Sequence, residues 1–321
     1  MFSKRLVLTA FCSALLFAFG PMGRAAEWPE RTITMLVMAP AGAPADVAAR
    51  TLARDLSASL GQPIVIENRM AGGGVVLMTS VANAKPDGYT LGLTAVGPAV
   101  IRPLIDDKVG FEFDRDFTPI MMFGDGPNTL LVSPKLGVNT VQEFVAYARQ
   151  HPDTTMAHGG PGTIGHLAAI RFAQDAKIKL NLIAYRGSPQ MINDLLSGQI
   201  SSGFPPYNPA AKNVKILAVA TEKRLDFLPD VPTFAEAGYP NVIATTWSAL
   251  VGPAHMPPEV VAKLNKAINA WMDEGDHRAQ FNKIGFRLTG GEPAALTKQV
   301  QEDRSRWTGI LREHHITFNP Q

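Results

Sequence analysis

Short apolar segments alternate with amphipathic segments along most of the chain, and loops containing Gly or Pro separate them. Short apolar runs bounded by such loops are typical of buried strands, whereas apolar residues at helical spacing predict helices. The predicted strands cover residues 33–40, 63–68, 89–97, 129–134, 179–187 and 214–221, and the predicted helices cover residues 46–61, 72–88, 140–152 and 188–199, while residues 154–176 read as strand, loop and helix. Because strands alternate with helices, we expect parallel sheets with helices on both faces.

The same alternation occurs twice, before and after Phe117, which predicts two α/β lobes. The first helix is expected to begin with Asp46 as its N-cap and to end at Gly61, and the helix at 140–152 to open at Asn139 or Thr140. Beyond Pro257 the chain is mostly helical, with apolar residues at helical spacing and a later helix around residues 300–311.

The N-terminal residues have the layout of a secretory signal peptide. Lys4 and Arg5 precede an apolar block at residues 6–19, and the small residues Ala25 and Ala26 predict cleavage after Ala25. The apolar block is shorter than the roughly 20 residues with which a helix spans a bilayer. We therefore expect a mature protein outside the cytoplasm, with a retained membrane anchor as the alternative.

Cleavage after residue 25 changes both the charge and the cysteine content. The removed segment contains three basic residues and no acidic residue, so the formal net charge changes from +2 to −1. The sequence has no cluster of Lys and Arg of the kind that binds nucleic acid, and we expect no nucleic-acid partner. Cys12 is the single cysteine, so the mature chain is expected to contain no disulfide and no cysteine nucleophile.

Two loops rich in small residues, 39–46 and 157–166, each connect a predicted strand to a predicted helix. Ligands of open α/β sheets bind at the carboxyl ends of strands, where the next helix begins. Backbone N–H groups at a helix N-terminus, together with the helix dipole, favour a carboxylate or a phosphate. The two loops are therefore candidate anion sites, and the alternative is that both are ordinary turns.

The sequence His158-Gly159-Gly160-Pro161-Gly162 also fits the oxyanion hole of a hydrolase. An α/β-hydrolase needs a Gly-x-Ser-x-Gly nucleophile elbow, which the chain does not contain; neither Ser133 nor Ser188 stands in such a sequence. Without a nucleophile, an oxyanion hole has no covalent step to assist. We therefore expect no catalytic residues, and a hydrolase remains the third interpretation.

Cofactor motifs give no positive signal either. The glycine run in AGGGVVLMTS lacks the Gly-x-Gly-x-x-Gly spacing of a dinucleotide site. The histidines at 151, 255, 277, 314 and 315 have no partners at metal-ligand spacing. We expect neither a cofactor nor a metal.

Several longer stretches of the chain form a recognisable series. In order, they are WPERTITMLVMAPAGAPADVAARTLARDLSASLGQPIVIENRMAGGG, KPDGYTL, DFTPI, YRGSPQMINDLLSGQI, LAVAT, LPDVPTFAEAGYP and TTWSALVGPAHMPPEVVAKLN. With these stretches, nearly all of the expected mature chain resembles the extracytoplasmic solute-binding receptors of the tripartite tricarboxylate transporter family, also called Bug proteins. The resemblance implies a periplasmic two-lobed clamshell of the α/β class, with mixed, mainly parallel sheets flanked by helices.

The resemblance also implies that one loop of each lobe contacts an organic carboxylate in the cleft, through backbone N–H groups and water. In the first loop the family pattern falls on Pro40, Ala41, Gly42, Ala43 and Asp46. In the second loop it falls on residues 157–166, from which the expected ligand-binding positions are His158, Gly160, Gly162, Thr163, Ile164 and His166. The implied division is one lobe of residues 26–125 plus 248–321 and a second lobe of residues 126–247.

This chain departs from the family pattern at several of these positions. Ala43 replaces a glycine, and His158 and Ile164 replace small hydroxyl residues. Phe204 and Tyr207 stand in a proline-rich turn, FPPYNP, that lacks the acidic or amide residue common there. We therefore expect the distal half of the pocket to prefer an apolar or aromatic acid to a small polar dicarboxylate.

The resemblance implies partners as well as a ligand. Receptors of this family deliver their solute to membrane permease subunits of a tripartite tricarboxylate transporter, and a role as input protein for a membrane sensor kinase is the alternative. The family expectation for the oligomeric state is a monomer.

Overall fold

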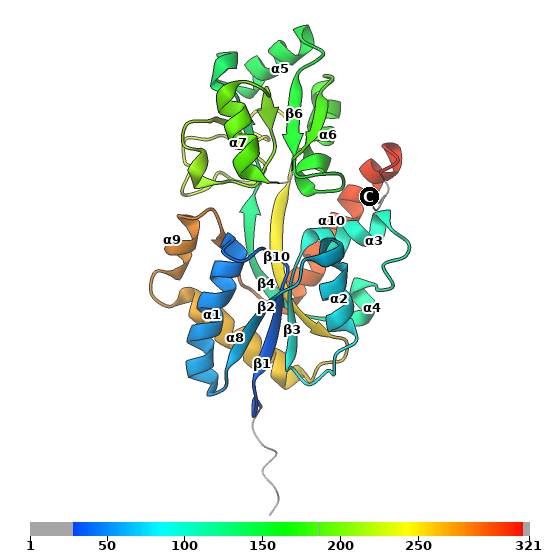
Figure 1. The fold of residues 1–321 in the computed structure, drawn as a ribbon, viewed down its shortest axis with the longest axis vertical. Helices are drawn as coiled ribbons and strands as arrows, with labels where there is room; N and C mark the ends of the chain where they lie inside the picture. Colours follow the sequence, from blue (N-terminus) through cyan, green and yellow to red (C-terminus); the bar gives the residue numbers. More distant parts are fainter. Residues whose placement is uncertain (1–27, 186, 317–321) are drawn as a thin grey trace, which may run out of the picture.

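The computed structural model describes residues 28–316 apart from residue 186, so the predicted signal peptide lies outside the described residues. The described chain folds into two lobes, each built on its own β-sheet, and two strands run from one lobe toward the other (Figure 1). The two α/β lobes predicted from the sequence are thus observed.

The first lobe contains a six-stranded sheet in the order β11-β4-β10-β3-β1-β2. Its strands are β1 (Ile33–Val37), β2 (Ile64–Asn68), β3 (Thr90–Ala95), β4 (Phe117–Pro127), β10 (Thr245–Pro253) and β11 (Arg287–Leu288). Strand β1 pairs in parallel with β2 and β3, as the strand-helix alternation predicts. Strand β10 pairs antiparallel with β3 and β4, and β11 pairs antiparallel with β4, so the sheet is mixed.

Helices cover both faces of this sheet. They are α1 (Pro44–Leu60), η1 (Ala71–Gly74), α2 (Val75–Ala82), η2 (Gly97–Ile101), α3 (Arg102–Ile105), α4 (Phe113–Asp116), α8 (Pro258–Asp273), α9 (His277–Asn282) and α10 (Pro293–Glu313). In α1 the buried residues Ala48, Leu52 and Leu56 recur every four positions, which places one face of the helix on the core. The helix ends at Gly61, whose φ of 70° is left-handed, as expected for a glycine after a helix.

Two predicted helix starts need correction. The N-cap of α1 is Ala43 rather than Asp46, which lies inside the first turn of the helix. The predicted helix at 72–88 is instead a short 3-10 turn, η1, followed by α2, which ends at Ala82. The glycines of η1 cause the break, because Gly72 and Gly73 adopt φ values of 63° and 65° that an α-helix does not contain.

The second lobe contains a five-stranded sheet in the order β7-β6-β8-β5-β9. Its elements are β5 (Thr129–Val132), η3 (Pro134–Leu136), α5 (Val141–Gln150), β6 (Thr155–His158), α6 (Ile164–Ala176), β7 (Asn181–Ala184), α7 (Ser188–Ser197), β8 (Ser202–Gly203), η4 (Pro209–Ala211) and β9 (Lys215–Val219). Of the two predicted openings for the helix at 140–152, Thr140 is the N-cap, and its hydroxyl accepts from the N–H of Glu143. Strand β6 pairs in parallel with β7 and β8, whereas β5 pairs antiparallel with β8 and β9.

The two strands that lead from lobe to lobe, β4 and β10, were missed in the sequence pattern. They pair with each other from Phe117 opposite Pro253 to Pro127 opposite Thr245. Glycines and prolines interrupt their apolar pattern, for example in FGDGP, which reads as a loop when no partner strand is known. The predicted lobe boundaries fall inside these two strands and stay a prediction.

Apolar packing also continues from one lobe to the other. One buried cluster includes Leu36 and Ile101 of the first lobe together with Leu167 and Phe172 of the second. Helix α10 lies on β4 and reaches α6, so the C-terminal helix touches both lobes (Figure 1). The position of α6, and of the loop that precedes it, therefore depends on contacts with both lobes.

Candidate functional site

The first candidate loop lies between β1 and α1, and the buried carboxylate of Asp46 holds it in place. Asp46 is only 1% exposed. Its Oδ2 accepts from the N–H of Gly42 at 2.8 Å and from Nε of Arg50 at 2.9 Å, and its Oδ1 accepts from Nδ2 of Asn68 at 2.7 Å. The same Nδ2 donates to the carbonyl oxygen of Ala39 at 2.9 Å. Three separate segments are thereby fixed around one carboxylate.

The electrostatics of Asp46 follow from these partners. Burial raises the pKa of its carboxyl, but hydrogen bonds from Arg50, Asn68 and the N–H of Gly42, with the charge of Arg50, outweigh burial and hold the pKa below the usual range. Asp46 is therefore an ionised structural group beneath the loop. The sequence predicted Asp46 as a site residue, but gave no sign of its partner Asn68.

The first turn of α1 contains backbone donors without a partner. Ala43 caps the helix and has no side-chain acceptor, so no capping hydrogen bond forms. The N–H of Ala43 itself bonds the carbonyl of Pro40 at 3.0 Å. Within the described residues, the N–H groups of Ala45 and Asp46 have no hydrogen-bond partner, as is usual for an uncapped first turn. Pro40, Ala41 and Gly42 are exposed beside them.

The second candidate loop, between β6 and α6, is closed by its own histidines. Nδ1 of His158 accepts from the N–H of Gly160 at 3.1 Å, and Nδ1 of His166 accepts from the N–H of Gly162 at 3.2 Å. The hydroxyl of Thr163 donates to the carbonyl of Gly160 at 2.8 Å and accepts from the N–H of His166 at 3.4 Å. Two of the N–H groups expected to meet a ligand are therefore already engaged.

The two imidazoles lie against each other, with ring centroids 4.3 Å apart. His158 is buried and His166 is half-buried. Burial lowers the pKa of both rings, and for His166 the charges of His158 and His314 lower it further, to about 4. With Nδ1 accepting, each neutral ring carries its proton on Nε2. The Nδ1 atom of His158 therefore caps the turn at Gly160.

Replacing His166 tests this arrangement through the pH dependence of stability. Its folded pKa of about 4 lies below the unfolded value of 6.5, so the unfolded chain binds more protons between these values. The contribution of His166 to the free energy of unfolding is therefore fully present above pH 6.5. It decreases as the pH falls toward 4, by about 1–2 kcal/mol after allowance for partial exposure. We expect His166→Asn, which keeps an acceptor but cannot titrate, to flatten urea-denaturation free energies over this range.

The exposed His255 provides the control, since His255→Asn leaves the loop untouched. If the unfolding free energy of the wild type and of His166→Asn changed equally with pH, the lowered pKa of His166 would be contradicted.

The remaining predicted site residues lie in different surroundings. Ile164 is 4% exposed and belongs to the apolar cluster shared by the lobes. Phe204 is fully buried and stacks on Phe234 with ring centroids 5.4 Å apart, so its ring is part of the core, and the expectation that it lines the pocket is wrong for this structure. Tyr207 is half-buried, and its ring packs on Phe227 at 5.2 Å.

A chain of close contacts connects the two loops through η1 and η2. A Cβ placed on Gly74 would lie 2.8 Å from Pro98 and 3.0 Å from Met38, the residue that follows β1. On the other side, a Cβ on Gly162 would lie 3.0 Å from Ile105 and 3.7 Å from Ile101. The second loop therefore rests on η2 and α3 of the first lobe, and the first loop lies against the same region.

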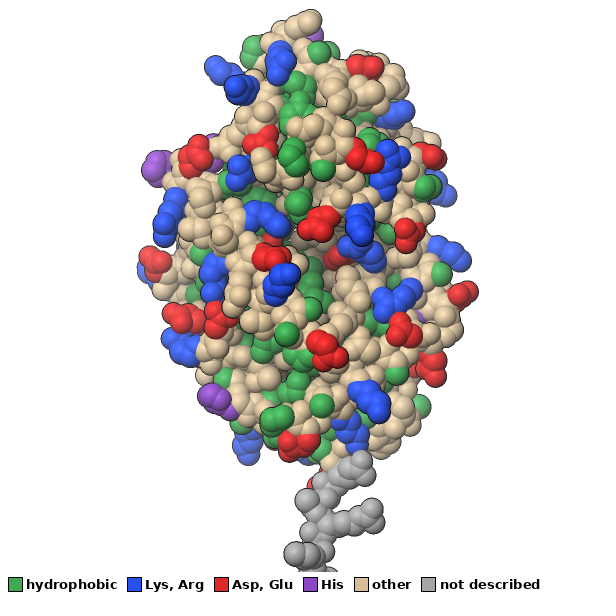
Figure 2. Space-filling model, turned by 180° about the vertical axis from the view of Figure 1, so that it is seen from behind, with side chains coloured by type: hydrophobic (Ala, Val, Ile, Leu, Met, Phe, Trp, Pro, Cys, Tyr) green, Lys and Arg blue, Asp and Glu red, His purple; other side chains and the backbone are tan. Residues whose placement is uncertain are grey.

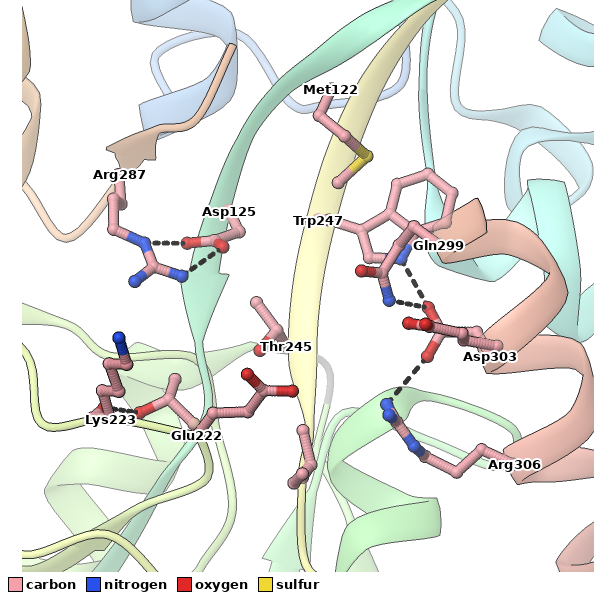
Figure 3. Close-up of a pocket in the computed structure, with 13 residues that line it drawn as sticks. Met122, Asp125, Glu222, Lys223, Thr245, Trp247, Arg287, Gln299, Asp303 and Arg306 are labelled. Atoms are coloured by element: carbon pink, nitrogen blue, oxygen red, sulfur yellow. Dashed lines mark hydrogen bonds and ion pairs between the residues drawn. The ribbon is translucent and has the colours of Figure 1, made fainter. Parts of the chain in front are cut away.

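A polar cavity of about 260 Å³ lies beside the crossing strands, and the sequence gave no indication of it. Arg287 forms a bidentate pair with the buried Asp125 of β4, at 3.0 and 2.7 Å (Figure 3). Nε1 of Trp247 donates to Asp303 at 2.7 Å from the opposite side (Figure 3). Burial raises the pKa of Asp125, and Arg287 opposes that effect. These pairs fasten β4 and β10 to β11 and α10.

The back surface, the metal-ligating side chains and the helices of the described residues indicate no further site. The back of the molecule shows basic and acidic side chains interspersed, without a patch of one sign (Figure 2). Among the residues that the structure describes, no group of three or more His, Cys, Asp or Glu side chains is arranged to hold a metal. No helix within the described ranges combines the length and the apolar character needed to cross a membrane.

The sequence and the fold of this chain are similar to those of known proteins. The model of the tripartite tricarboxylate transporter family receptor matches residues 48–316. Protein BugT of Bordetella pertussis is 31% identical over 293 residues, which cover 89% of this chain and 90% of BugT. A structure of an R. palustris protein with adipate has a TM-score of 0.78 and 30% identity, covering 90% of this chain and 99% of that one. MatC from Rhodopseudomonas palustris, with bound malate, has a TM-score of 0.73 and 30% identity, covering 88% and 99%.

Two sheets joined by crossing strands, with a strand-helix loop of each lobe near the junction, define the class of two-lobed periplasmic binding proteins, to which the similar structure of BugD belongs. Within that class, the chain belongs to the tripartite tricarboxylate transporter receptor family. The resemblance seen in the sequence and the clamshell fold that it implied are thereby confirmed.

Proposed function

We propose that this protein is an extracytoplasmic receptor that captures a small organic carboxylate between the loop at 39–46 and the loop at 157–166. The observation that carries the proposal is the uncapped first turn of α1, where the N–H groups of Ala45 and Asp46 have no partner in the described chain. A carboxylate would complete this turn and benefit from the helix dipole. Adipate and malate, named for two structural relatives, are both carboxylates.

In this proposal the second loop contributes a different set of donors from the one predicted. The N–H groups of Gly160 and Gly162 are engaged by the histidines, whereas those of Ile164 and Gly165 open the first turn of α6. These two N–H groups cannot be satisfied within the helix. Water can bridge them to a ligand that does not reach them directly.

The state of the histidines also favours a receptor over a hydrolase. An oxyanion hole needs unoccupied N–H groups, and those of Gly160 and Gly162 are occupied. Capture through main-chain donors holds an anion without moving a proton. One related solved structure is that of a TctC solute binding protein from Polaromonas, and delivery of the solute to a permease as a monomer is the role that this family suggests.

We still expect the pocket to prefer an apolar or aromatic acid, but other residues support this expectation than those predicted. Phe204 is in the core, but Ile101 and Ile105 contact the second loop at Gly162, and Tyr207 stands at the lobe junction, where its N–H bonds the carbonyl of Pro127 at 2.7 Å. These side chains would face the part of a ligand that lies away from the carboxylate. A longer or aromatic acid would bury more apolar surface against them than malate does.

Titration of residues 26–321 with aliphatic and aromatic mono-, di- and tricarboxylates tests the proposal, by calorimetry and by thermal stabilisation. We expect one class to bind and Gly42→Ala to weaken it about tenfold, because Gly42 has a φ of 82° and supplies the N–H that Asp46 holds. Gly61→Ala is the matched control, with a φ of 70° at the other end of the same helix and open space around it. No binding at millimolar concentration, or equal losses in both variants, would refute the proposal.

A further inference from the structure

Asn128 is the single residue between β4 of the first lobe and β5 of the second, and it is 1% exposed. Its N–H donates to the carbonyl of Ala244 at 3.1 Å, and its carbonyl accepts from the N–H of Ala220 at 2.9 Å. Ala220 in turn accepts from the N–H of Ala244 at 2.8 Å. The backbone at Asn128 thus joins both crossings to the end of β9.

The side chain of Asn128 links elements that belong to different lobes. Its Oδ1 accepts from the hydroxyl of Thr246, on β10 in the sheet of the first lobe, at 3.0 Å. Its Nδ2 donates to the carbonyl of Phe204, just after β8 in the sheet of the second lobe, at 3.1 Å. An amide offers an acceptor and a donor at these two positions, whereas a carboxylate accepts only and an apolar side chain does neither.

The Phe204 carbonyl also lies against the start of α6. A Cβ on Gly165 would lie 2.2 Å from this carbonyl oxygen and 3.3 Å from Nδ2 of Asn128. The amide therefore stands in van der Waals range of the first turn of α6, which the loop at 157–166 enters. A change in the angle between the lobes would move Thr246 relative to Phe204 and break one of the two side-chain hydrogen bonds.

We infer that Asn128 is a positioning residue that sets the angle between the two lobes and, through Phe204, the place of the loop at 157–166. It does so without contact with a ligand. The consequence for affinity rests on the proposed function, whereas the consequence for the interlobe angle does not. When the competent arrangement is only partly populated, apparent affinity falls by that fraction.

The chain provides a matched control in Asn265, a second buried asparagine, which lies on α8 and bonds only within the first lobe. It is 6% exposed, and its Nδ2 donates to the carbonyls of Ile120 at 2.9 Å and Gly291 at 2.8 Å, both in the first lobe. Asn265→Leu and Asn128→Leu both remove a fully bonded buried amide. The two variants should lose comparable stability but differ in their effect on the junction.

The experiment measures the distance between spin labels in the ligand-free protein, residues 26–321. Cys12 is the single cysteine of the full chain, so labels can be attached to Asn83→Cys in the first lobe and Gln150→Cys in the second, both exposed positions. We expect Asn128→Leu to broaden or shift the distance distribution and to weaken carboxylate binding about tenfold. Thr246→Val, which cuts only the link to β10, should change both in the same direction.

Asn265→Leu should keep the wild-type distance distribution and wild-type affinity. An unchanged distribution in Asn128→Leu, or the same change in Asn265→Leu, would overturn the inference. If Asn128→Leu does not fold, Thr246→Val decides in its place. If the wild type binds no carboxylate, the proposed function fails, but the label distances still decide the role of Asn128.

Discussion

Replacing Gly165 by alanine is expected to destabilise the protein by about 3 kcal/mol, as overpacking of a close-packed interior does. The added Cβ would lie 2.2 Å from the carbonyl oxygen of Phe204, and that neighbour is backbone rather than a flexible side chain. Either α6 or the turn after β8 must move. Because the loop at 157–166 leads into α6, we also expect carboxylate affinity to fall more than tenfold. Urea denaturation and calorimetry measure the two effects.

The same substitution at Gly309 is expected to change stability in the opposite direction. It lies in α10, is exposed, and has no atom within 4 Å of an added Cβ. Gly309→Ala should therefore stabilise the protein by about 0.5–1 kcal/mol, because alanine has the higher helix propensity. If Gly165→Ala matched Gly309→Ala in stability and kept the wild-type affinity, the close contact between α6 and the Phe204 turn would be disproved.

Replacing Asp46 by alanine is expected to cost about 2–4 kcal/mol. Removal of the carboxylate leaves the N–H of Gly42 without its acceptor. It also removes one of the two acceptors of Nδ2 of Asn68 and the ion-pair partner of Arg50. The loop at 39–46 would then lose its fixed shape, so ligand binding should be lost together with stability. Urea denaturation at neutral pH gives the stability, and calorimetry gives the affinity.

The pH dependence separates the charge of Asp46 from its shape. Because its folded pKa lies below the ordinary value of 3.8, ionised Asp46 stabilises the protein above that value and loses the effect as the pH falls through the folded pKa. The difference between wild type and Asp46→Ala should therefore narrow in acid. Asp273→Ala, which breaks an exposed pair with Arg278, is the control and should cost less than about 1 kcal/mol. An equal cost in both variants would contradict the buried role of Asp46.

In the proposed function, the binding groups are fixed before the ligand arrives. Asp46 holds the first loop, and His158 and His166 hold the second, while the N-termini of α1 and α6 would bind the anion. Such preorganisation lowers the ordering cost of binding. The remaining freedom lies in the angle between the lobes, which is why the junction at Asn128 matters.

Local signals in the sequence predicted the local parts of this structure. Helical spacing in residues 46–61 and a glycine at 61 placed α1 and its end, and the Gly-rich segments placed both loops between a strand and a helix. Strands β4 and β10 were missed, because Gly124, Gly126 and Pro127 break the apolar pattern that a strand normally shows. Their partner is more than a hundred residues away, so no local pattern contains it.

The sequence by itself determined the fold class, with two α/β lobes and two loops of small residues at helix starts. It also determined the family that the chain resembles. Only the tertiary structure decided which backbone donors are free. It placed Asn68 on Asp46 and closed the second loop with His158 and His166, and it buried Phe204 in the core. The bond from Asn68 and the packing of Phe204 on Phe234 depend on residues distant in sequence. The histidine bonds are local, but a hydrogen bond is set by position in space rather than by residue type.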